Sequence, residues 1–452
     1  MIHTFQNMGR YFCVDTNSGA VHELDKPACT LLERLTPPLN AEECPADVLA
    51  ELELGGFDRA ELCEIYTELR ELEQSGQLFT SDECEAFAAS LRPAPLKSMC
   101  LNVAHDCNLR CAYCFAAQGD FGTGRELMPL ATAKAAVDFL LAHSGNRRNL
   151  ELDFFGGEPL MNWSVVVDTV AYARSLEPAN GKNFRFTITT NGLLLDDEKI
   201  AFINLEMANV VLSLDGRRHV HDDMRPTPNG HGSYDLVVPQ YQKLVAERQL
   251  QDPDRSEYYV RGTFTRKNLN FAQDVLHMAD LGFRKLSMEP AVLEEALPFA
   301  LREADLPAIL AEYDRLTEQL ATRRDIDFFH FMLDLGQGPC VLKRLRGCSC
   351  GNEYCAVTPN GDIYPCHQFV GLEDWRMGSV HTGAWDAQKQ AELVRAHLYN
   401  KPECRECWAK FYCGGGCNAA NVLYRGTLFK PTPLSCELER KRVECAIALA
   451  AC

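Results

Sequence analysis

The chain has 452 residues, of which 46% are apolar and 24% are charged, as in a soluble globular protein. This length exceeds one ordinary hydrophobic core, so we expect two or three domains. The net charge of −18 argues against a nucleic-acid groove, which needs clustered basic residues. The first residues lack a signal-peptide pattern, and no stretch is long and apolar enough to cross a bilayer. We therefore expect a cytoplasmic protein with neither a nucleic-acid nor a membrane partner.

The cysteine content is the most unusual feature of the composition, at 21 residues. Disulfides do not persist in a reducing cytosol, so this number points to metal or redox chemistry.

Residues 1–92 are expected to form a separate small domain. Tyr11–Val14 and Val21–Leu24 flank the polar turn Asn17–Gly19, which predicts a β-hairpin. Three helical patterns follow, and then a short strand is expected; these lie at 27–35, 45–54, 59–75 and 76–79. A hairpin with three helices is the element order of a winged helix, but the acidic helices disfavour DNA. The order resembles the peptide-recognition element of natural-product maturases, where a leader peptide adds a strand to the sheet edge. A plain accessory domain is the alternative.

Residues 96–330, after the linker Pro93–Pro95, alternate between strand and helix patterns. Such alternation predicts parallel strands joined by right-handed crossovers, either as a curled open barrel or as a doubly wound sheet. The expected strands are 97–103, 149–155, 183–190, 209–214, 258–265 and 285–289. The expected helices are 129–143, 162–175, 195–206, 233–247, 269–281 and 305–323.

Chemically distinctive residues follow the first four expected strands. Cys107 follows the first, Gly156–Pro159 the second, Asn191 the third and Ser213–Gly216 the fourth. Both candidate architectures place their chemistry at the carboxyl ends of the strands. This coincidence favours an α/β fold built on a partial (β/α)6 barrel.

Cys107, Cys111 and Cys114 form a C-x3-C-x2-C loop. Three thiolates leave one iron of a 4Fe–4S cluster without a protein ligand, whereas an electron-carrier cluster takes four. The spacing resembles the signature of the radical S-adenosylmethionine (SAM) enzymes, in which the open iron binds SAM and electron transfer releases a 5′-deoxyadenosyl radical. A zinc knuckle is the alternative, but no fourth ligand stands at ribbon spacing beside the loop.

The GGEP segment after the second strand suits the amino group of SAM. Its glycines allow close backbone approach, and carbonyl oxygens with the Glu158 carboxylate can accept from an ammonium. The segment matches the SAM-binding GGEP of radical SAM enzymes, and the resemblance also places a Ser-x-Asp-Gly segment and the following arginine near the ribose and carboxylate of SAM. The SAM-binding residues expected on these grounds are Gly156, Gly157, Glu158, Pro159, Asn191, Ser213, Asp215 and Arg225.

Residues 336–452 lose clear periodicity while cysteines become dense, which is typical of a domain folded around metal. The spacing has the seven-cysteine layout of a SPASM domain, which holds two auxiliary 4Fe–4S clusters. This resemblance implies that one cluster is ligated by Cys404, Cys407, Cys413 and Cys436. It implies that the other is ligated by Cys348, Cys366 and Cys417, with Cys340 as the best fourth ligand. Cys350, Cys355 or a substrate thiolate are alternatives for that fourth position, and a zinc ribbon is the alternative for the whole domain.

His367 directly follows Cys366. Some SPASM enzymes carry an aspartate here that accepts a proton during oxidation, so His367 is a candidate catalytic base; a structural role is equally open.

The whole chain resembles the SCIFF-peptide maturases, which form thioether cross-links in a cysteine-rich ribosomal peptide. The matching phrases are NSGAVH at 17–22, HDCNLRCAYCFAAQGDFG at 105–122, the segment 347–354 and VTPNGDIYPCHQFVG at 357–371. The resemblance implies that an adenosyl radical takes hydrogen from a threonine or another residue, that a peptide thiolate bonds to that carbon, and that the surplus electron leaves through the auxiliary clusters.

The same resemblance implies SAM and three 4Fe–4S clusters as cofactors. It implies two partners, a precursor peptide bound through its leader and an external electron donor of the ferredoxin or flavodoxin type. Other SPASM enzymes, which form formylglycine or carbon–carbon links, are the alternative. A non-catalytic iron–sulfur or zinc protein would leave GGEP and the six βα units unexplained.

Overall fold

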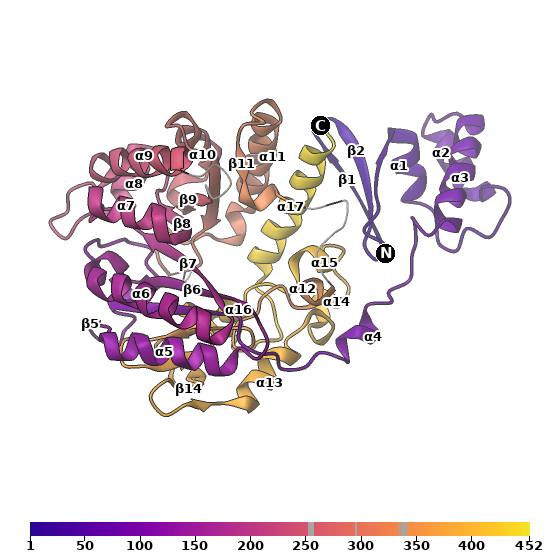
Figure 1. The fold of residues 1–452 in the computed structure, drawn as a ribbon. Coiled ribbons are helices and arrows are strands. Elements are labelled where there is room, and N and C mark those ends of the chain that lie inside the picture. The colour runs from indigo at the N-terminus through magenta and orange to yellow at the C-terminus, as the bar shows by residue number, and fades with distance from the viewer. Residues whose placement is uncertain (252–256, 294–295, 334, 336–340) are drawn as a thin grey trace.

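The computed structural model describes residues 1–251, 257–293, 296–333, 335 and 341–452. Its body is an α/β domain in which one large sheet is covered by helices, and the C-terminal third of the chain packs against one side of that domain (Figure 1). The helix predicted at 233–247 and the segment that follows the last strand of the barrel lie next to residues outside the described ranges.

Six parallel strands in chain order form the centre of the large sheet, and each pairs with the strand that follows it. The short strand β11 (Asp327–Phe328) continues the sheet beyond the sixth. In the described part of the chain the first and sixth strands do not pair, so the barrel is open. These findings confirm the predicted partial (β/α)6 barrel. The six strands are β4 (Ser98–His105), β6 (Asn149–Gly156), β7 (Asn183–Thr190), β8 (Met207–Ser213), β9 (Tyr258–Phe264) and β10 (Lys285–Pro290).

The helices between these strands bury one face on the outside of the sheet. Along β6, Leu152 and Phe154 are fully buried beneath the helices, whereas Asp153 and Phe155 face the interior of the barrel. This alternation follows from the two-residue period of a strand. The covering helices are α5 (Leu130–His143), α6 (Trp163–Asn180), α7 (Asp197–Glu206), α8 (Arg218–Met224), α9 (Tyr234–Gln251), α10 (Phe271–Asp280) and α11 (Leu306–Thr322).

The C-terminal region joins the barrel through an element that the sequence patterns did not predict. Strand β12 (Tyr354–Val357) pairs in parallel with β4, the first barrel strand, and β13 (Asp362–Tyr364) pairs with β12 in the antiparallel sense. This pairing carries the residues after β13, including His367, to the open mouth of the barrel. The remaining C-terminal elements are β14 (Gly378–Ser379), β15 (Ala384–Trp385), α12 (Val341–Arg346), α13 (Ala387–Arg395), α14 (Pro402–Arg405), α15 (Lys410–Cys413), α16 (Asn418–Arg425) and α17 (Pro433–Ala450).

The N-terminal region contains the predicted hairpin and three helices, with two differences. An additional strand precedes the hairpin, so the sheet has the order β1-β2-β3. The expected strand at 76–79 is absent from the structure, because Phe79 adopts a positive φ of 54° and the segment packs through the buried Leu78 instead. The elements are β1 (Ile2–Asn7), β2 (Arg10–Asp15), β3 (Val21–Leu24), α1 (Lys26–Leu32), α2 (Ala46–Leu54) and α3 (Arg59–Gln74), followed by α4 (Glu85–Ala88).

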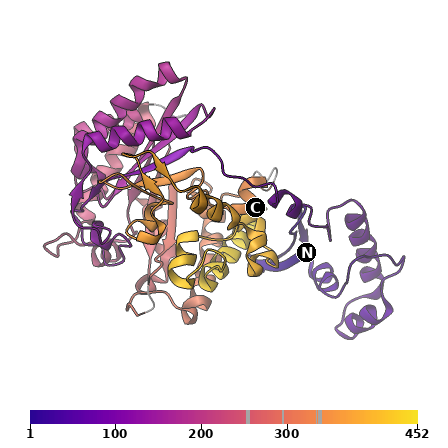
Figure 2. The ribbon, with the colours of Figure 1, turned by 90° about the horizontal axis from the view of Figure 1, so that it is seen from below.

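The N-terminal sheet is fixed to the C-terminal helix α17, while the helices α2 and α3 extend away from the body (Figure 2). Phe5 and Phe12 pack against Ile447, and the His3 ring stacks on Trp408 with centroids 3.8 Å apart. The two ends of the chain therefore support one another. Within the described ranges, no helix has the length and apolarity needed to span a membrane.

Candidate active site

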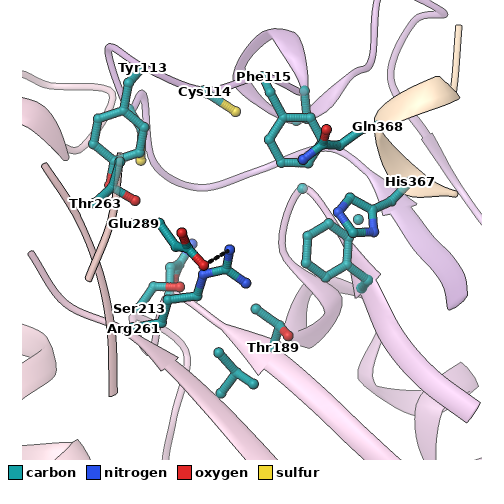
Figure 3. A pocket seen from close by; sticks show the side chains of 18 of the residues that line it. Tyr113, Cys114, Phe115, Thr189, Ser213, Arg261, Thr263, Glu289, His367 and Gln368 are labelled. Carbon is teal, nitrogen blue, oxygen red and sulfur yellow. Dashed lines mark ion pairs between the residues drawn. The ribbon is translucent and has the colours of Figure 1, made fainter. Parts of the chain in front are cut away.

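The cysteine loop (residues 106–116) leaves the carboxyl end of β4 and is fixed to the last residue of α8 and the segment that follows it. Arg110 N donates to Pro226 O at 2.8 Å, and Ala112 N donates to Met224 O at 2.9 Å. The three loop cysteines, Cys107, Cys111 and Cys114, all line one cavity of about 460 Å³, which we call the first cavity. Figure 3 shows Cys114 directed into this space together with Tyr113 and Phe115.

Burial keeps two of the loop thiols protonated in the metal-free protein. It raises the pKa of Cys107 to about 12 and that of Cys111 to about 11. Thiolates are the forms that ligate iron, so a cluster bound at this loop would displace these protons.

The GGEP segment approaches the cysteine loop so closely that only glycine fits at its first two positions. A Cβ on Gly156 would lie 2.3 Å from Ala104 O, and one on Gly157 would lie 2.2 Å from Asp106 O. A hydrogen bond from Gly157 N to Ala104 O, at 2.8 Å, holds the GGEP segment against the end of β4. The backbone of both glycines lines the first cavity, next to the loop cysteines.

Glu158 turns away from this cavity and fixes the next strand end. One oxygen accepts from Thr190 Oγ1 at 2.8 Å and from Leu160 N at 3.0 Å, and the other accepts from Asn191 N at 2.8 Å. Glu158 is fully buried, and burial raises the pKa of its carboxyl to about 7. Neither Glu158 nor Pro159 lines the first cavity, so the carboxylate acts on the turn that contains Asn191.

Asn191 links this turn to the cysteine loop. Its Nδ2 donates to Asn108 Oδ1 at 2.8 Å and lies 3.6 Å from Cys107 Sγ. Asn191 also lines the first cavity. Because Glu158 accepts a hydrogen bond from Asn191 N, Glu158 helps to fix where the Asn191 side chain lies in this cavity.

Tyr113 connects the cysteine loop to the ends of β8 and α8. Its hydroxyl donates to Asp215 Oδ2 at 2.6 Å and accepts from Arg225 Nη1 at 2.8 Å. Asp215 is fully buried behind this pair and also accepts from Thr263 N at 3.0 Å. Ser213, Arg225 and Tyr113 line the first cavity, whereas Asp215 does not.

The residues around the first cavity fit SAM beside a three-thiolate cluster. The volume lies within the range of small-molecule sites, and the loop thiols form one part of its wall. Two polar atoms near that wall, Arg225 Nε and Asn108 Nδ2, are buried without a hydrogen-bond partner among the described residues. Buried polar groups without partners cost free energy, so a bound polar cofactor would satisfy a need that the protein alone leaves open.

His367 lies on the opposite wall of the first cavity, between two aromatic rings (Figure 3). Its ring centroid is 4.8 Å from that of Phe155 and 5.5 Å from that of Phe115, and Nδ1 is 3.3 Å from Tyr354 OH. Burial, together with the charge of Arg261, lowers the pKa of His367 to about 4. The imidazole is therefore neutral at neutral pH.

A second cavity, of about 540 Å³, gathers the C-terminal cysteines. All four residues expected to ligate one auxiliary cluster line it, and Cys417 lies at its edge next to the first cavity. They come from three separate helices: Cys404 from α14, Cys413 from α15 and Cys436 from the first turn of α17, with Cys407 following α14.

The cysteines expected at the other auxiliary cluster are only partly described. Cys340 lies outside the described residues. Cys417 Sγ is 3.5 Å from Gln368 Oε1, two residues after Cys366. Cys350 N donates to Cys348 Sγ at 3.5 Å, and Cys350 is buried beside it.

Cys355, in contrast, is buried within β12 opposite Met99 and lines neither of the two cavities. No three His, Cys, Asp or Glu side chains of the described ranges surround a single ion position.

Sequence reasoning missed the residues at the ends of the fifth and sixth barrel strands. Thr263 and Arg261 on β9 and Glu289 on β10 line the first cavity. The rule that chemistry lies at the carboxyl ends of parallel strands, applied to β9 and β10 as it was to the first four strands, would have found Thr263 and Glu289.

Two family models match the chain. Residues 98–239 match a 4Fe–4S single cluster domain, and residues 348–408 match the SPASM iron–sulfur cluster-binding domain. The first match contains the cysteine loop and GGEP, and the second contains Cys366 and Cys407.

Individual proteins are similar over most of the chain. A cysteine-type anaerobic sulfatase-maturating enzyme of Clostridium novyi is 24% identical over 69% of this chain and 85% of its own. The solved structure of anSMEcpe with bound AdoMet and the Kp18Cys peptide has a TM-score of 0.65 at 20% identity, covering 79% of this chain and 99% of that one. SuiB of Streptococcus suis, solved with S-adenosylmethionine, has a TM-score of 0.53 at 13% identity, covering 96% and 98%.

Proposed function

We propose that this protein, which has a radical SAM domain followed by a SPASM domain and uses SAM and 4Fe–4S clusters, is a peptide maturase that forms thioether cross-links. Its substrate would be a cysteine-rich precursor peptide, in which a cysteine is joined to the carbon of a threonine or another residue. The sulfatase-maturating relative supports modification of a polypeptide side chain, and the resemblance of the sequence to SCIFF-peptide maturases supports the thioether.

One observation carries the proposal: the first and second cavities share a wall. Arg261, Glu289, Gln368 and Val292 line both cavities, so the loop cysteines and the C-terminal cysteines face connected space. A substrate lying across this wall would meet the site of hydrogen abstraction on one side and an electron acceptor on the other. Thioether formation needs both, because joining S–H to C–H removes two electrons and two protons.

The cofactors would supply the radical that removes the substrate hydrogen and the acceptor for the surplus electron. The chain's own residues bind and orient. The loop cysteines would hold the SAM-binding cluster, while the backbone of Gly156 and Gly157 with Asn191, Ser213 and Arg225 would hold SAM. Tyr113 and Glu158 fix these groups from behind. His367, on the wall opposite the loop cysteines, and Phe115 of the cysteine loop have ring centroids 5.5 Å apart and would exclude water from the substrate radical.

The auxiliary ligands are also proposals. We assign one cluster to Cys404, Cys407, Cys413 and Cys436, which line the second cavity together. We assign the other to Cys348, Cys366 and Cys417, with Cys340 as fourth ligand. Cys350 is the alternative, because its backbone N–H lies 3.5 Å from the Cys348 sulfur and its buried side chain is therefore close to that ligand.

The precursor leader would bind the N-terminal domain. β3 is the last strand in the order β1-β2-β3, so its outer edge offers backbone groups to an extended peptide. β1, at the other edge, packs against α17. We place this domain at residues 1–92, the barrel at 96–330 and the SPASM domain at 336–452, with a ferredoxin- or flavodoxin-type donor as the external reductant.

Formylglycine formation is the second candidate, because the sulfatase-maturating enzyme is similar over most of its length. Co-expression with each small cysteine-rich open reading frame beside the gene, followed by mass spectrometry, separates the two. Thioether formation removes two hydrogens per cross-link and retains every sulfur. Formylglycine formation removes the sulfur of one cysteine, and unmodified peptides throughout would contradict the proposal.

A further inference from the structure

The wall between the two cavities contains a charged pair that neither the cysteine motifs nor GGEP explains. Arg261 on β9 and Glu289 on β10 both line the first and the second cavity. Arg261 Nη2 lies 3.5 Å from Glu289 Oε1, and Figure 3 shows the pair in the middle of the cavity, between Tyr113 on one side and His367 on the other. Any substrate that spans the two cavities must pass this pair.

Few contacts with described residues hold the Arg261 side chain, although it lines both cavities. Its side chain is 55% exposed, and the Glu289 contact is its one ion pair with a described residue. A guanidinium carries five N–H donors in a fixed planar fork. Among the described residues no hydrogen bond from this side chain occurs, so most of these donors face the cavity.

Glu289, in contrast, is fixed from behind. Arg442 Nη2 lies 3.3 Å from Glu289 Oε2, and His330 Nε2 lies 3.5 Å from Oε1. Arg442 lies in the middle of α17, and its Nε donates to Tyr313 OH at 3.0 Å. Although burial opposes ionisation, Arg442, His330 and Arg261 together lower the pKa of Glu289 to about 2. Glu289 is thus a rigid, ionised support that keeps the Arg261 fork at the junction.

Several large apolar side chains in the lining of the first cavity are partly exposed. Phe115, Val292, Leu423 and Tyr424 line the first cavity, and their exposed fractions lie between 38% and 50%. Leu423 and Tyr424 belong to α16, which begins directly after Cys417. Such a surface favours an uncharged chain with apolar side chains.

These charges select the chemical class of the group that Arg261 binds. An incoming carboxylate would be attracted by Arg261 but would also face the ionised Glu289, which is 3.5 Å from the guanidinium. A neutral acceptor receives the same hydrogen bonds without that repulsion. A peptide carbonyl oxygen is such an acceptor, and an extended peptide offers one at every residue.

We propose that Arg261, supported by Glu289, binds backbone carbonyl oxygens of the substrate peptide where the peptide crosses from the first to the second cavity. This inference rests on the proposed function. It makes Arg261 a substrate-binding residue that fixes which peptide carbon lies next to SAM, and it predicts a preference for neutral residues at the crossing.

The test uses the holoenzyme with its clusters and SAM, and a fluorescent synthetic peptide of cysteines separated by threonines as probe. R261Q should weaken probe binding about tenfold or more, because hydrogen bonds from a charged donor are lost. R261K, which keeps the charge but not the planar fork, should weaken binding less. Probe peptides with aspartate in place of threonine should bind wild type more weakly than the neutral probe.

R376Q is the matched control. Arg376 is 49% exposed and pairs with Asp362 at 2.9 Å, yet it lines neither cavity, so this variant should bind the probe as wild type does. Wild-type affinity in R261Q would overturn the inference, and so would tighter binding of the acidic probe. Loss of iron or of SAM binding in both R261Q and R261K would overturn it in favour of a structural role. If wild type itself fails to bind the neutral probe, the inference is overturned, whereas the proposed function is tested separately by mass spectrometry of the co-expressed precursor peptide.

Discussion

Glu158→Gln tests whether the GGEP carboxylate acts on SAM through the turn at Asn191. The carboxylate accepts three hydrogen bonds, from Thr190 Oγ1, Leu160 N and Asn191 N, at 2.8 to 3.0 Å. A glutamine side chain has one acceptor oxygen, so its amide group must face at least one of these donors. A buried donor left without its acceptor costs about 1–3 kcal/mol.

That cost is large enough to be seen in cofactor binding. Asn191, whose side chain lies 3.6 Å from Cys107 Sγ, can shift to relieve this cost. If SAM binding has to reverse that shift, SAM affinity should fall roughly 5- to 150-fold. The assay is calorimetric titration of SAM into anaerobically reconstituted protein of known iron content. Iron content should stay near that of wild type, because the three loop thiols remain.

Glu177→Gln is the matched control for this prediction. Glu177 Oε1 also accepts a backbone N–H, from Phe184 at 2.7 Å, but it stands at the end of α6 away from both cavities. This variant should lose stability without losing SAM affinity. Unchanged SAM affinity in Glu158→Gln, or an equal loss in Glu177→Gln, would refute the reasoning.

Three further predictions follow from the same geometry. Alanine at the three loop cysteines together should abolish 5′-deoxyadenosine formation, measured by chromatography, while part of the iron stays in the C-terminal domain; persistent SAM cleavage would contradict the cluster assignment. Cys436→Ala should lower iron content and cross-linked product while SAM cleavage continues, and an unchanged yield of product would exclude this cysteine as a ligand. Tyr113→Phe removes a hydroxyl that is hydrogen-bonded to Asp215 and Arg225. It should lower the free energy of unfolding by about 1–3 kcal/mol in denaturant titrations, and it should weaken SAM binding. Wild-type values in both measurements would show that these hydrogen bonds do not stabilise the protein or its SAM site.

The sequence was sufficient for the barrel because its strands and helices have strong local patterns. The strand 183–190 was predicted at its exact bounds, and the others within about two residues. The pairing of β12 with β4 joins segments more than 250 positions apart in the numbering, and no local pattern encodes such a partner. The strand expected at 76–79 failed because apolar residues also occur where a loop buries one side chain, as Leu78 does.

The site was predictable in its residue types but not in its orientations. The cysteines and glycines follow from spacing, since both depend on backbone position. The direction of Glu158 could not be read from GGEP, because the same carboxylate can face SAM or the turn at Asn191, and only the neighbouring strand decides which. Arg261 was missed for a related reason: its importance arises from Glu289 and the C-terminal domain, which reach it only in the folded chain.

Isotope transfer from the peptide to 5′-deoxyadenosine would show whether the adenosyl radical takes its hydrogen from a threonine of the peptide. A precursor peptide with deuterium on the carbons of its threonine side chains would be incubated with reduced enzyme and SAM. The deuterium content of the 5′-deoxyadenosine would then be measured by mass spectrometry. We expect deuterium from the peptide to appear in 5′-deoxyadenosine in parallel with the cross-link. Cross-linked peptide accompanied by 5′-deoxyadenosine without deuterium would show that the radical does not act on threonine, and cross-linking without any 5′-deoxyadenosine would contradict the account as a whole.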